Sequence, residues 1–220
     1  MPGGVGQVMR RLPLFPLPVV LLPGTAMPLH IFEPRYRQMV ARCLEFDRRF
    51  GLVYHDPDRL GPFEMEPGRV GTVAEIGEFR ALPDGRSLLI ARGEVRFRLE
   101  DGIESDTPYF EGLVEEVEDE PPRDVEELMD RRQRSVDLLS AVLDRLDAEA
   151  AVEVREALRI DPAQETSFQL AARVRVDPAW LQTLLETTDE ARRLDRLDLL
   201  LSQALAGGGE VPEDGGGAEE

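Results

Sequence analysis

Residues 12–17, Leu-Pro-Leu-Phe-Pro-Leu, and residues 28–37, Pro-Leu-His-Ile-Phe-Glu-Pro-Arg-Tyr-Arg, form an apolar, proline-rich stretch that ends in charged residues. Between them lies Pro23-Gly24, a pair that marks turns, so the apolar runs on either side predict two short strands. Pro34 is tolerated only in the first turn of a helix, and the apolar residues after it recur at helical spacing. The stretch therefore predicts a strand, a turn, a second strand and a helix.

The chain continues with short extended runs as far as residue 119. Strands are predicted by the apolar patterns at 50–54, 70–79, 87–91, 95–99 and 109–117. Pro83-Asp84-Gly85 is a hairpin signal between two of these runs. Short antiparallel strands punctuated by glycine and proline favour a small closed or nearly closed barrel, here with one inserted helix.

The composition changes at Asp119-Glu120-Pro121-Pro122, after which helical spacing replaces strand punctuation. One helical face is indicated by Val136, Leu139, Val142, Leu143 and Leu146, and another by Leu194, Leu197, Leu201 and Leu205. Helix starts are predicted at Asp161-Pro162, at Asp177-Pro178, and at Thr187, which forms a capping box with Glu190.

We therefore assign the chain to the α+β class and divide it into four segments. Residues 1–9 are expected to be a flexible arm and residues 10–119 a β-barrel subdomain. Residues 120–206 are expected to form a helical bundle, and residues 207–220 a disordered tail rich in glycine and acidic residues.

The charge of the chain bears on its partners. The formal net charge is −18, and nonspecific binding to nucleic acid or to anionic lipid needs a positive surface. The single cysteine excludes an internal disulfide and a multi-cysteine zinc site. There is no apolar run of bilayer length and no leader pattern at the start, so we expect a cytoplasmic protein that does not contact membranes.

Taken in order, these motifs resemble the N-terminal, substrate-binding domain of Lon proteases, most closely its stand-alone bacterial form. The resemblance continues through Phe50-Gly51-Leu52-Val53, the Val70-Gly71-Thr72 run, Asp84-Gly85-Arg86 and Gly93-Glu94-Val95, and covers roughly residues 10–205. It implies a PUA-like β pseudo-barrel with one inserted helix, followed by a helical subdomain. It also implies recognition of polypeptide substrates for proteolysis.

Catalysis is not expected from this sequence. The ATPase of full-length Lon proteases needs a P-loop lysine, and their protease uses a serine–lysine pair. All 26 basic residues here are arginine, which stays protonated and cannot act as a general base. We expect no enzymatic activity, no cofactor and no metal.

Several residues with reactive side chains have structural interpretations. His30 lies among apolar neighbours and is expected to be structural, and Cys43 is expected to be a small buried apolar residue. His55, near Asp56 and Asp58, could touch a metal, but no second cluster completes a site, so a solvated loop is expected. The acidic run 111–120 is interpreted as a solvated strand face and linker.

The opening stretch supplies the candidate binding residues. A peptide-accepting groove is predicted from Leu14, Phe15, Leu29 and Phe32, and recognition residues at the helix start from Glu33, Arg35, Tyr36 and Arg37. The alternatives are that the first four belong to the barrel core and that the second four cap the helix and form surface ion pairs.

The favoured function is a module that binds extended or unfolded polypeptide or a partner protein, with an ATP-dependent protease or a chaperone as the expected associate. The alternative is an RNA-binding PUA-like module, in which Arg10, Arg11, Arg35, Arg37, Arg48 and Arg49 gather into one patch. An enzyme of unknown type is the third hypothesis and needs a pocket with convergent polar groups.

Overall fold

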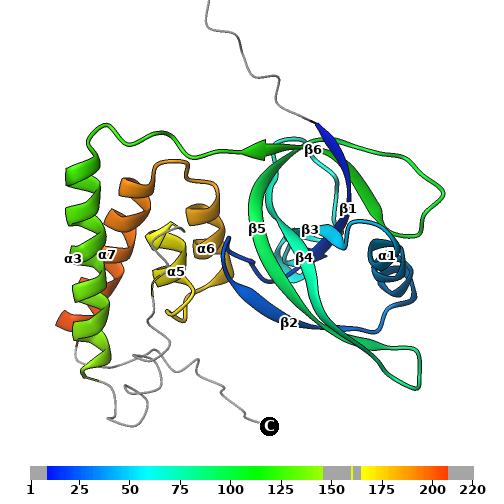
Figure 1. Ribbon diagram of the computed structural model, residues 1–220, viewed down its shortest axis with the longest axis horizontal. Coiled ribbons are helices and arrows are strands. Elements are labelled where there is room, and N and C mark those ends of the chain that lie inside the picture. Colours follow the sequence, from blue (N-terminus) through cyan, green and yellow to red (C-terminus); the bar gives the residue numbers. More distant parts are fainter. Residues whose placement is uncertain (1–8, 146–159, 161–164, 208–220) are drawn as a thin grey trace, which may run out of the picture.

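A computed structural model of the chain describes residues 9–145, 160 and 165–207. The strands are β1 (Arg10–Leu17), β2 (Ala26–Ile31), β3 (Arg49–Tyr54), β4 (Val70–Ala81), β5 (Ser87–Gly102) and β6 (Phe110–Val117). The helices are α1 (Pro34–Glu45), α2 (Pro57–Leu60), α3 (Val125–Leu143), α5 (Thr166–Ala171), α6 (Pro178–Leu185) and α7 (Glu190–Ala206). In Figure 1 the β-rich half and the helical half lie side by side, with α1 against the far side of the sheet. The predicted arm except Met9, Leu146 of the first predicted helical face, the Asp161-Pro162 helix start and the predicted tail after Gly207 lie outside the described residues.

The six strands form one sheet in the order β2-β5-β4-β3-β1-β6, and β5 also pairs with β6. The pairing thus runs from β5 through β4, β3, β1 and β6 and returns to β5. The strands of this sheet are followed by the helices of the second half, which confirms the α+β class. The β1–β3 pair is parallel, whereas antiparallel strands were predicted throughout. Parallel strands need a long crossover, and β2 with α1 provides it.

β5 is one continuous strand. Two strands were predicted in its place because the apolar pattern of the sequence is interrupted at Arg92-Gly93. A Cβ atom added at Gly93 would collide with the carbonyl oxygen of Leu22, so glycine lets the 21–24 segment pack across the strand. The predicted hairpin turn is confirmed, with Gly85 at a φ of +80°, a value that glycine adopts without strain. β2 leaves the circuit and pairs along the first part of β5 only.

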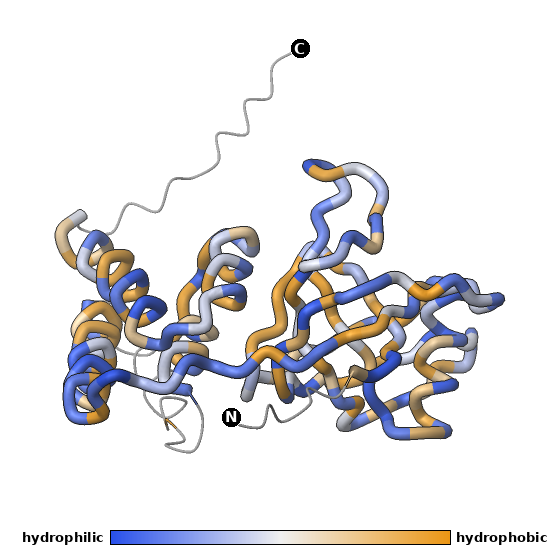
Figure 2. The backbone as a smooth tube through the Cα atoms, turned by 90° about the horizontal axis from the view of Figure 1, so that it is seen from above, coloured by the Kyte–Doolittle hydropathy of each residue, from blue (hydrophilic) through white to orange (hydrophobic). Residues whose placement is uncertain are grey.

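Two apolar clusters fill the β-rich half, one beneath α1 and one between β1, β5 and β6. A third cluster fills the helical half and also includes Val20, Leu22 and Val70 from the β-rich half. The two halves therefore share buried apolar surface. Figure 2 shows that the segment leading from β6 to α3 is hydrophilic, so the apolar part of this contact comes from other elements.

The structure confirms one predicted helix start and contradicts another. Asp177 caps α6 by accepting a hydrogen bond of 2.7 Å from the backbone N–H of Ala179, as predicted. The predicted cap at Thr187 is wrong, because Asp189 accepts from the first backbone N–H groups of α7. Glu190 is buried and pairs with Arg132 of α3. It serves helix packing rather than a capping box.

Candidate functional site

Three of the predicted binding residues lie inside the molecule. Leu14 is fully buried between β1, β5 and β6, and Phe15 and Tyr36 pack against each other beneath α1 with ring centroids 4.1 Å apart. Burial raises the pKa of Tyr36 to about 12. These side chains are not accessible to a peptide, so the core alternative holds for Leu14 and Phe15. The burial of Tyr36 fits neither of the two interpretations predicted for it.

The other predicted residues lie at the surface or at its edge. Leu29 is half-buried against the core, whereas Phe32, 58% exposed, follows the end of β2. Glu33 precedes α1 but its side chain does not cap the helix, and it pairs instead with Arg35 at 2.9 Å. The guanidinium of Arg35 also stacks over the buried Tyr36 ring, 4.5 Å from its centroid. The ion-pair interpretation therefore holds for these two residues, and Arg37 is exposed.

A shallow hollow of about 460 Å³ lies on the outer face of β2, β5 and β4, and we call it the sheet groove. Residues paired across antiparallel strands share a face of the sheet. The pairs Pro28 with Ile90 and His30 with Leu88 therefore form its floor, and Arg80 of β4 lies beyond Leu88. Leu88 and Ile90 are only half-buried, so the sheet groove presents apolar surface. The His30 ring lies 5.8 Å from that of Phe32, which extends the apolar surface past the end of β2.

The sheet groove borders an open edge of the sheet. In the described part of the chain, β2 pairs with β5 alone. The carbonyl of Thr25 accepts from the N–H of Gly93 at 2.8 Å, so odd-numbered residues of β2 point their backbone groups at β5 and even-numbered ones point away. Pro28, which lacks an N–H, occupies an outward position, as expected for an edge strand. The outward N–H groups belong to Ala26 and His30.

A second hollow of about 490 Å³ lies between α1 and the β4–β5 hairpin, and we call it the helix groove. Val40, Ala41 and Leu44 of α1 line one side, and Phe79 of β4 the other. Phe79 is 40% exposed and also lines the sheet groove, so the two hollows meet at its ring. The charged residues of the helix groove are Arg37 and Arg86.

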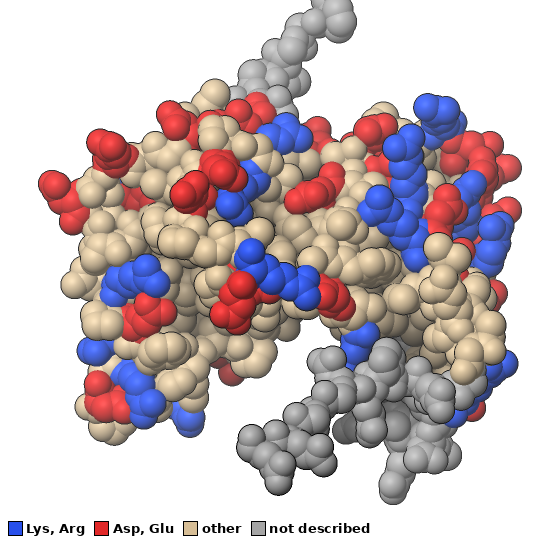
Figure 3. All heavy atoms as spheres, turned by 180° about the vertical axis from the view of Figure 1, so that it is seen from behind, with Lys and Arg blue, Asp and Glu red and all other residues tan. Residues whose placement is uncertain are grey.

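Most arginines of the predicted RNA patch already have partners. Arg11 pairs with Glu111, Arg35 with Glu33 and Arg49 with Glu94, and Arg48 donates to the carbonyls of Ile76 and Gly77 at 2.9 Å. On the face seen in Figure 3, basic and acidic side chains are interspersed over both halves without a continuous basic groove. Neither observation favours nucleic-acid binding.

Two expectations of solvent exposure are wrong. His55 is buried because the loop after β3 folds over it, and its Nε2 lies 2.7 Å from the carbonyl oxygen of Gly61. Glu111 is only 2% exposed and pairs with Arg11, and hydrogen bonds from Arg11, Ser105 and Thr107 lower its pKa although burial acts to raise it. Cys43 is buried as predicted, which raises its pKa to about 12. The described residues contain no cluster of three or more side chains suited to a metal.

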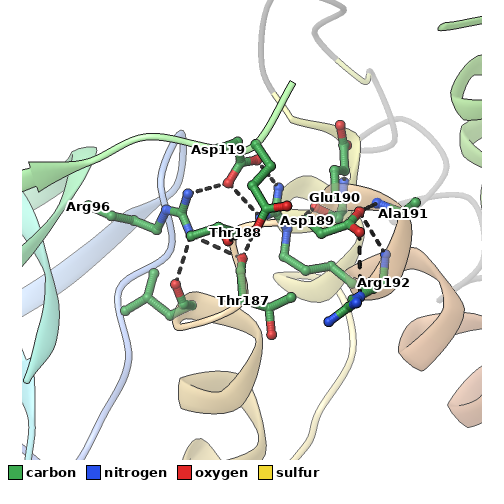
Figure 4. Close-up of polar contacts among 12 residues, drawn as sticks. Arg96, Asp119, Thr187, Thr188, Asp189, Glu190, Ala191 and Arg192 are labelled. Atoms are coloured by element: carbon green, nitrogen blue, oxygen red, sulfur yellow. Dashed lines mark hydrogen bonds and ion pairs between the residues drawn. The ribbon is translucent and has the colours of Figure 1, made fainter. Parts of the chain in front are cut away.

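Asp119, also assigned to the solvated acidic run, lies at the contact between the two halves. It accepts from Arg96 of β5 and from Arg193 of α7, as Figure 4 shows for the first of these pairs. Both guanidiniums also donate to the carbonyl of Thr187, and both stack on the ring of Phe168. We call these five residues the junction network. Arg96 belongs to the strand predicted at 95–99, and neither Arg96 nor Arg193 had a predicted role.

The junction network is largely buried, although the side chain of Asp119 keeps 19% of its surface exposed. Arg193 has no exposed surface, and its Nε donates to the hydroxyl of Ser167 at 2.8 Å. The pKa of Arg96 is lowered because the effect of burial exceeds the opposing effect of the nearby negative charge of Asp119. Burial and the charge of Asp119 raise the pKa of Glu165, which is half-buried at the start of α5. Because its polar groups are matched internally, the junction network fixes the two halves against each other.

Comparison with known proteins places this architecture in a family. Residues 11–203 match the family described as the ATP-dependent protease La (LON) substrate-binding domain. Among curated proteins, the Lon protease of Cytophaga hutchinsonii is 24% identical over 200 residues, and Lon protease 1 of Syntrophobacter fumaroxidans is 28% identical over 201 residues. These alignments cover 88% and 87% of this chain, which spans 24% of the length of each relative.

Solved structures of Lon N-terminal domains have a similar fold. A crystal structure of a Lon N-terminal domain protein from Xanthomonas campestris is 29% identical, with a TM-score of 0.59, and the match covers 86% of this chain and 96% of that one. The N-terminal domain of the Lon protease from the Mycobacterium avium complex has a TM-score of 0.69 over 88% of this chain and 98% of that one, and at 21% identity it supports the fold alone. The chain therefore belongs to the family of ATP-dependent protease La (Lon) substrate-binding domains.

Proposed function

We propose that this chain binds extended polypeptide along the free edge of β2, with apolar side chains seated in the sheet groove, and that the bound polypeptide is a substrate for ATP-dependent proteolysis. The observation that carries the proposal is the open strand edge beside an apolar hollow. The substrate role comes from the family's description as a substrate-binding domain.

The edge supplies affinity that does not depend on sequence. An added strand can accept from the N–H groups of Ala26 and His30 and can donate to the outward carbonyls of β2. Such pairing favours a chain that is locally unfolded, because most backbone groups of a folded protein are already paired.

The sheet groove supplies the preference for exposed apolar residues. In an extended peptide successive side chains point to opposite faces, so alternate residues would lie beside Pro28 and His30. Long apolar side chains among them would reach across β2 towards Leu88 and Ile90. Apolar residues exposed in an extended segment are a mark of unfolding, which suits a protein that selects chains for degradation.

The proposal is tested by titrating a permanently unfolded polypeptide, reduced and carboxymethylated so that it cannot refold, into the purified chain and measuring heat release. We expect binding in the micromolar range. The variant Ile90→Asp should weaken binding at least tenfold, because a bound apolar side chain would then be placed against a charge.

The matched control is Leu199→Asp, which changes the net charge equally at an apolar residue of α7 that is 62% exposed. It should bind as the wild type does. Circular dichroism verifies that both variants are folded. Absence of binding by the wild type at tens of micromolar, or equal loss in both variants, would contradict the proposal.

A further inference from the structure

We infer that the helix groove selects polypeptide segments in which a carboxylate lies next to apolar residues, and that Arg37 is the residue that reads the carboxylate. This inference rests on the proposed function, since it names the class of polypeptide that is bound. It is carried by the position of Arg37, by the absence of an acidic partner for it among the described residues, and by the apolar side chains beside it.

Arg37 lies against the hairpin opposite. A Cβ atom added at Gly85 would collide with the Nη2 atom of Arg37, so the guanidinium lies close to the backbone of the hairpin tip. The left-handed φ of Gly85 and the absence of a side chain there leave the space that the guanidinium occupies. This contact places the cation at the helix groove, which Arg37 lines.

Arg37 has unused hydrogen-bonding capacity. Its neighbours are paired, Arg35 with Glu33 and Arg86 with Asp84. Within the described parts of the chain, no carboxylate lies within 4.0 Å of the Arg37 guanidinium.

The chemistry of the helix groove fits one occupant. A guanidinium presents a planar set of donors that matches a carboxylate. Val40, Leu44 and Phe79 supply the apolar surface beside it. An extended segment that rests apolar residues on these side chains presents an acidic side chain to Arg37, because segments within a long unfolded polypeptide carry acidic side chains but no terminus.

The test uses three fluorescent twelve-residue peptides that share one alternating apolar sequence. The first has a central glutamate and an amidated C-terminus, the second a central glutamine and a free C-terminal carboxylate, and the third a central glutamine and an amidated C-terminus. Fluorescence anisotropy measures their affinities for the full chain, for Arg37→Gln and for Arg42→Gln. Arg42 is the matched control, because it lies on the same helix, stacks on Phe46 and is not part of the helix groove.

We expect the wild type to bind the first peptide about tenfold more tightly than the second and the third, as one added charge-assisted contact allows. A gain in affinity for the second peptide alone would overturn the assignment to an acidic side chain. Arg37→Gln should abolish the difference and leave the affinity for the neutral peptide unchanged, and Arg42→Gln should preserve the difference.

Equal wild-type affinity for all three peptides would overturn the inference while leaving polypeptide binding intact. Equal loss of the preference in both arginine variants would also overturn it, since the effect would then come from overall charge. Failure of all three peptides to bind the wild type would refute the proposed function, and the inference with it.

Discussion

The junction network and the helix groove both contain arginines, but they differ in how the guanidinium groups are matched. Arg193 is fully buried, and Asp119, Thr187 and Ser167 accept its hydrogen bonds. Arg37 is exposed beside an apolar hollow and has no acidic partner among the described residues. An arginine satisfied inside the fold stabilises the fold, whereas one left unsatisfied at a groove is available to a ligand. The predictions below test this contrast.

The largest effect is expected at the junction network. Asp119→Ala should lower the free energy of unfolding by about 3–5 kcal/mol, because two buried guanidiniums lose their counter-charge. Urea denaturation measures the change. The adjacent exposed Glu118→Ala should stay within about 0.5 kcal/mol of the wild type, and a similarly small loss for Asp119→Ala would show that the network does not hold the halves together.

The second-largest loss of stability is expected in the opening stretch, where it distinguishes a core residue from a surface residue. Leu14→Ala should cost about 3 kcal/mol through the cavity it leaves. Phe32→Ala, at a residue that is 58% exposed, should cost less than about 0.5 kcal/mol and should weaken binding of the unfolded polypeptide. Thermal unfolding and calorimetric titration of both variants give the comparison. If Phe32→Ala is the more destabilising variant, the assignment of Leu14 to the core and of Phe32 to the surface is contradicted.

A smaller effect is expected at the hairpin tip. Gly85→Ala should cost about 1 kcal/mol because alanine tolerates a positive φ poorly, and it should also displace Arg37. Gly61→Ala is the matched control, with a φ of +75° and nothing near an added Cβ atom. Both variants should lose similar stability, but only Gly85→Ala should lose the preference for carboxylate-bearing peptides. Loss of that preference in both would show that the position of Arg37 is not responsible.

The smallest effect is the pH dependence of the Arg11–Glu111 pair. The pKa of Glu111 is lowered in the folded chain, so its contribution to stability is present above the unfolded pKa of about 4.3 and is lost as the pH falls through the folded pKa. The stability difference between wild type and Glu111→Gln should therefore be larger at pH 7 than at pH 3. Denaturant titrations at the two pH values measure it, and a difference independent of pH would count against the ion pair.

The sequence predicted the elements better than the surfaces. The Pro34 helix start, the Gly85 turn and the Asp177 cap were readable because each depends on local backbone conformation. The parallel β1–β3 pair and the burial of His55 were not, because each depends on segments that meet only after folding.

The candidate site shows the same limit. Phe32 was predicted to be part of the site and lies at the surface. Leu14 and Phe15 were also included although they are buried, because apolar strand residues look alike in the sequence whether they face a core or a groove. The sheet groove pairs Pro28 with Ile90, residues separated by β3 and β4 in the sequence. Arg96 and Arg193 are charged and were not expected to be buried, since only the distant Asp119 makes their burial tolerable.

Residue-resolved amide hydrogen exchange tests the central claim most directly. In the free chain the outward N–H groups of Ala26 and His30 should exchange rapidly, while those of Met27 and Leu29, which point at β5, should be protected. Adding the unfolded polypeptide should protect Ala26 and His30. If their exchange is unchanged at saturating polypeptide while protection appears at another surface, the β2 edge is not the binding site.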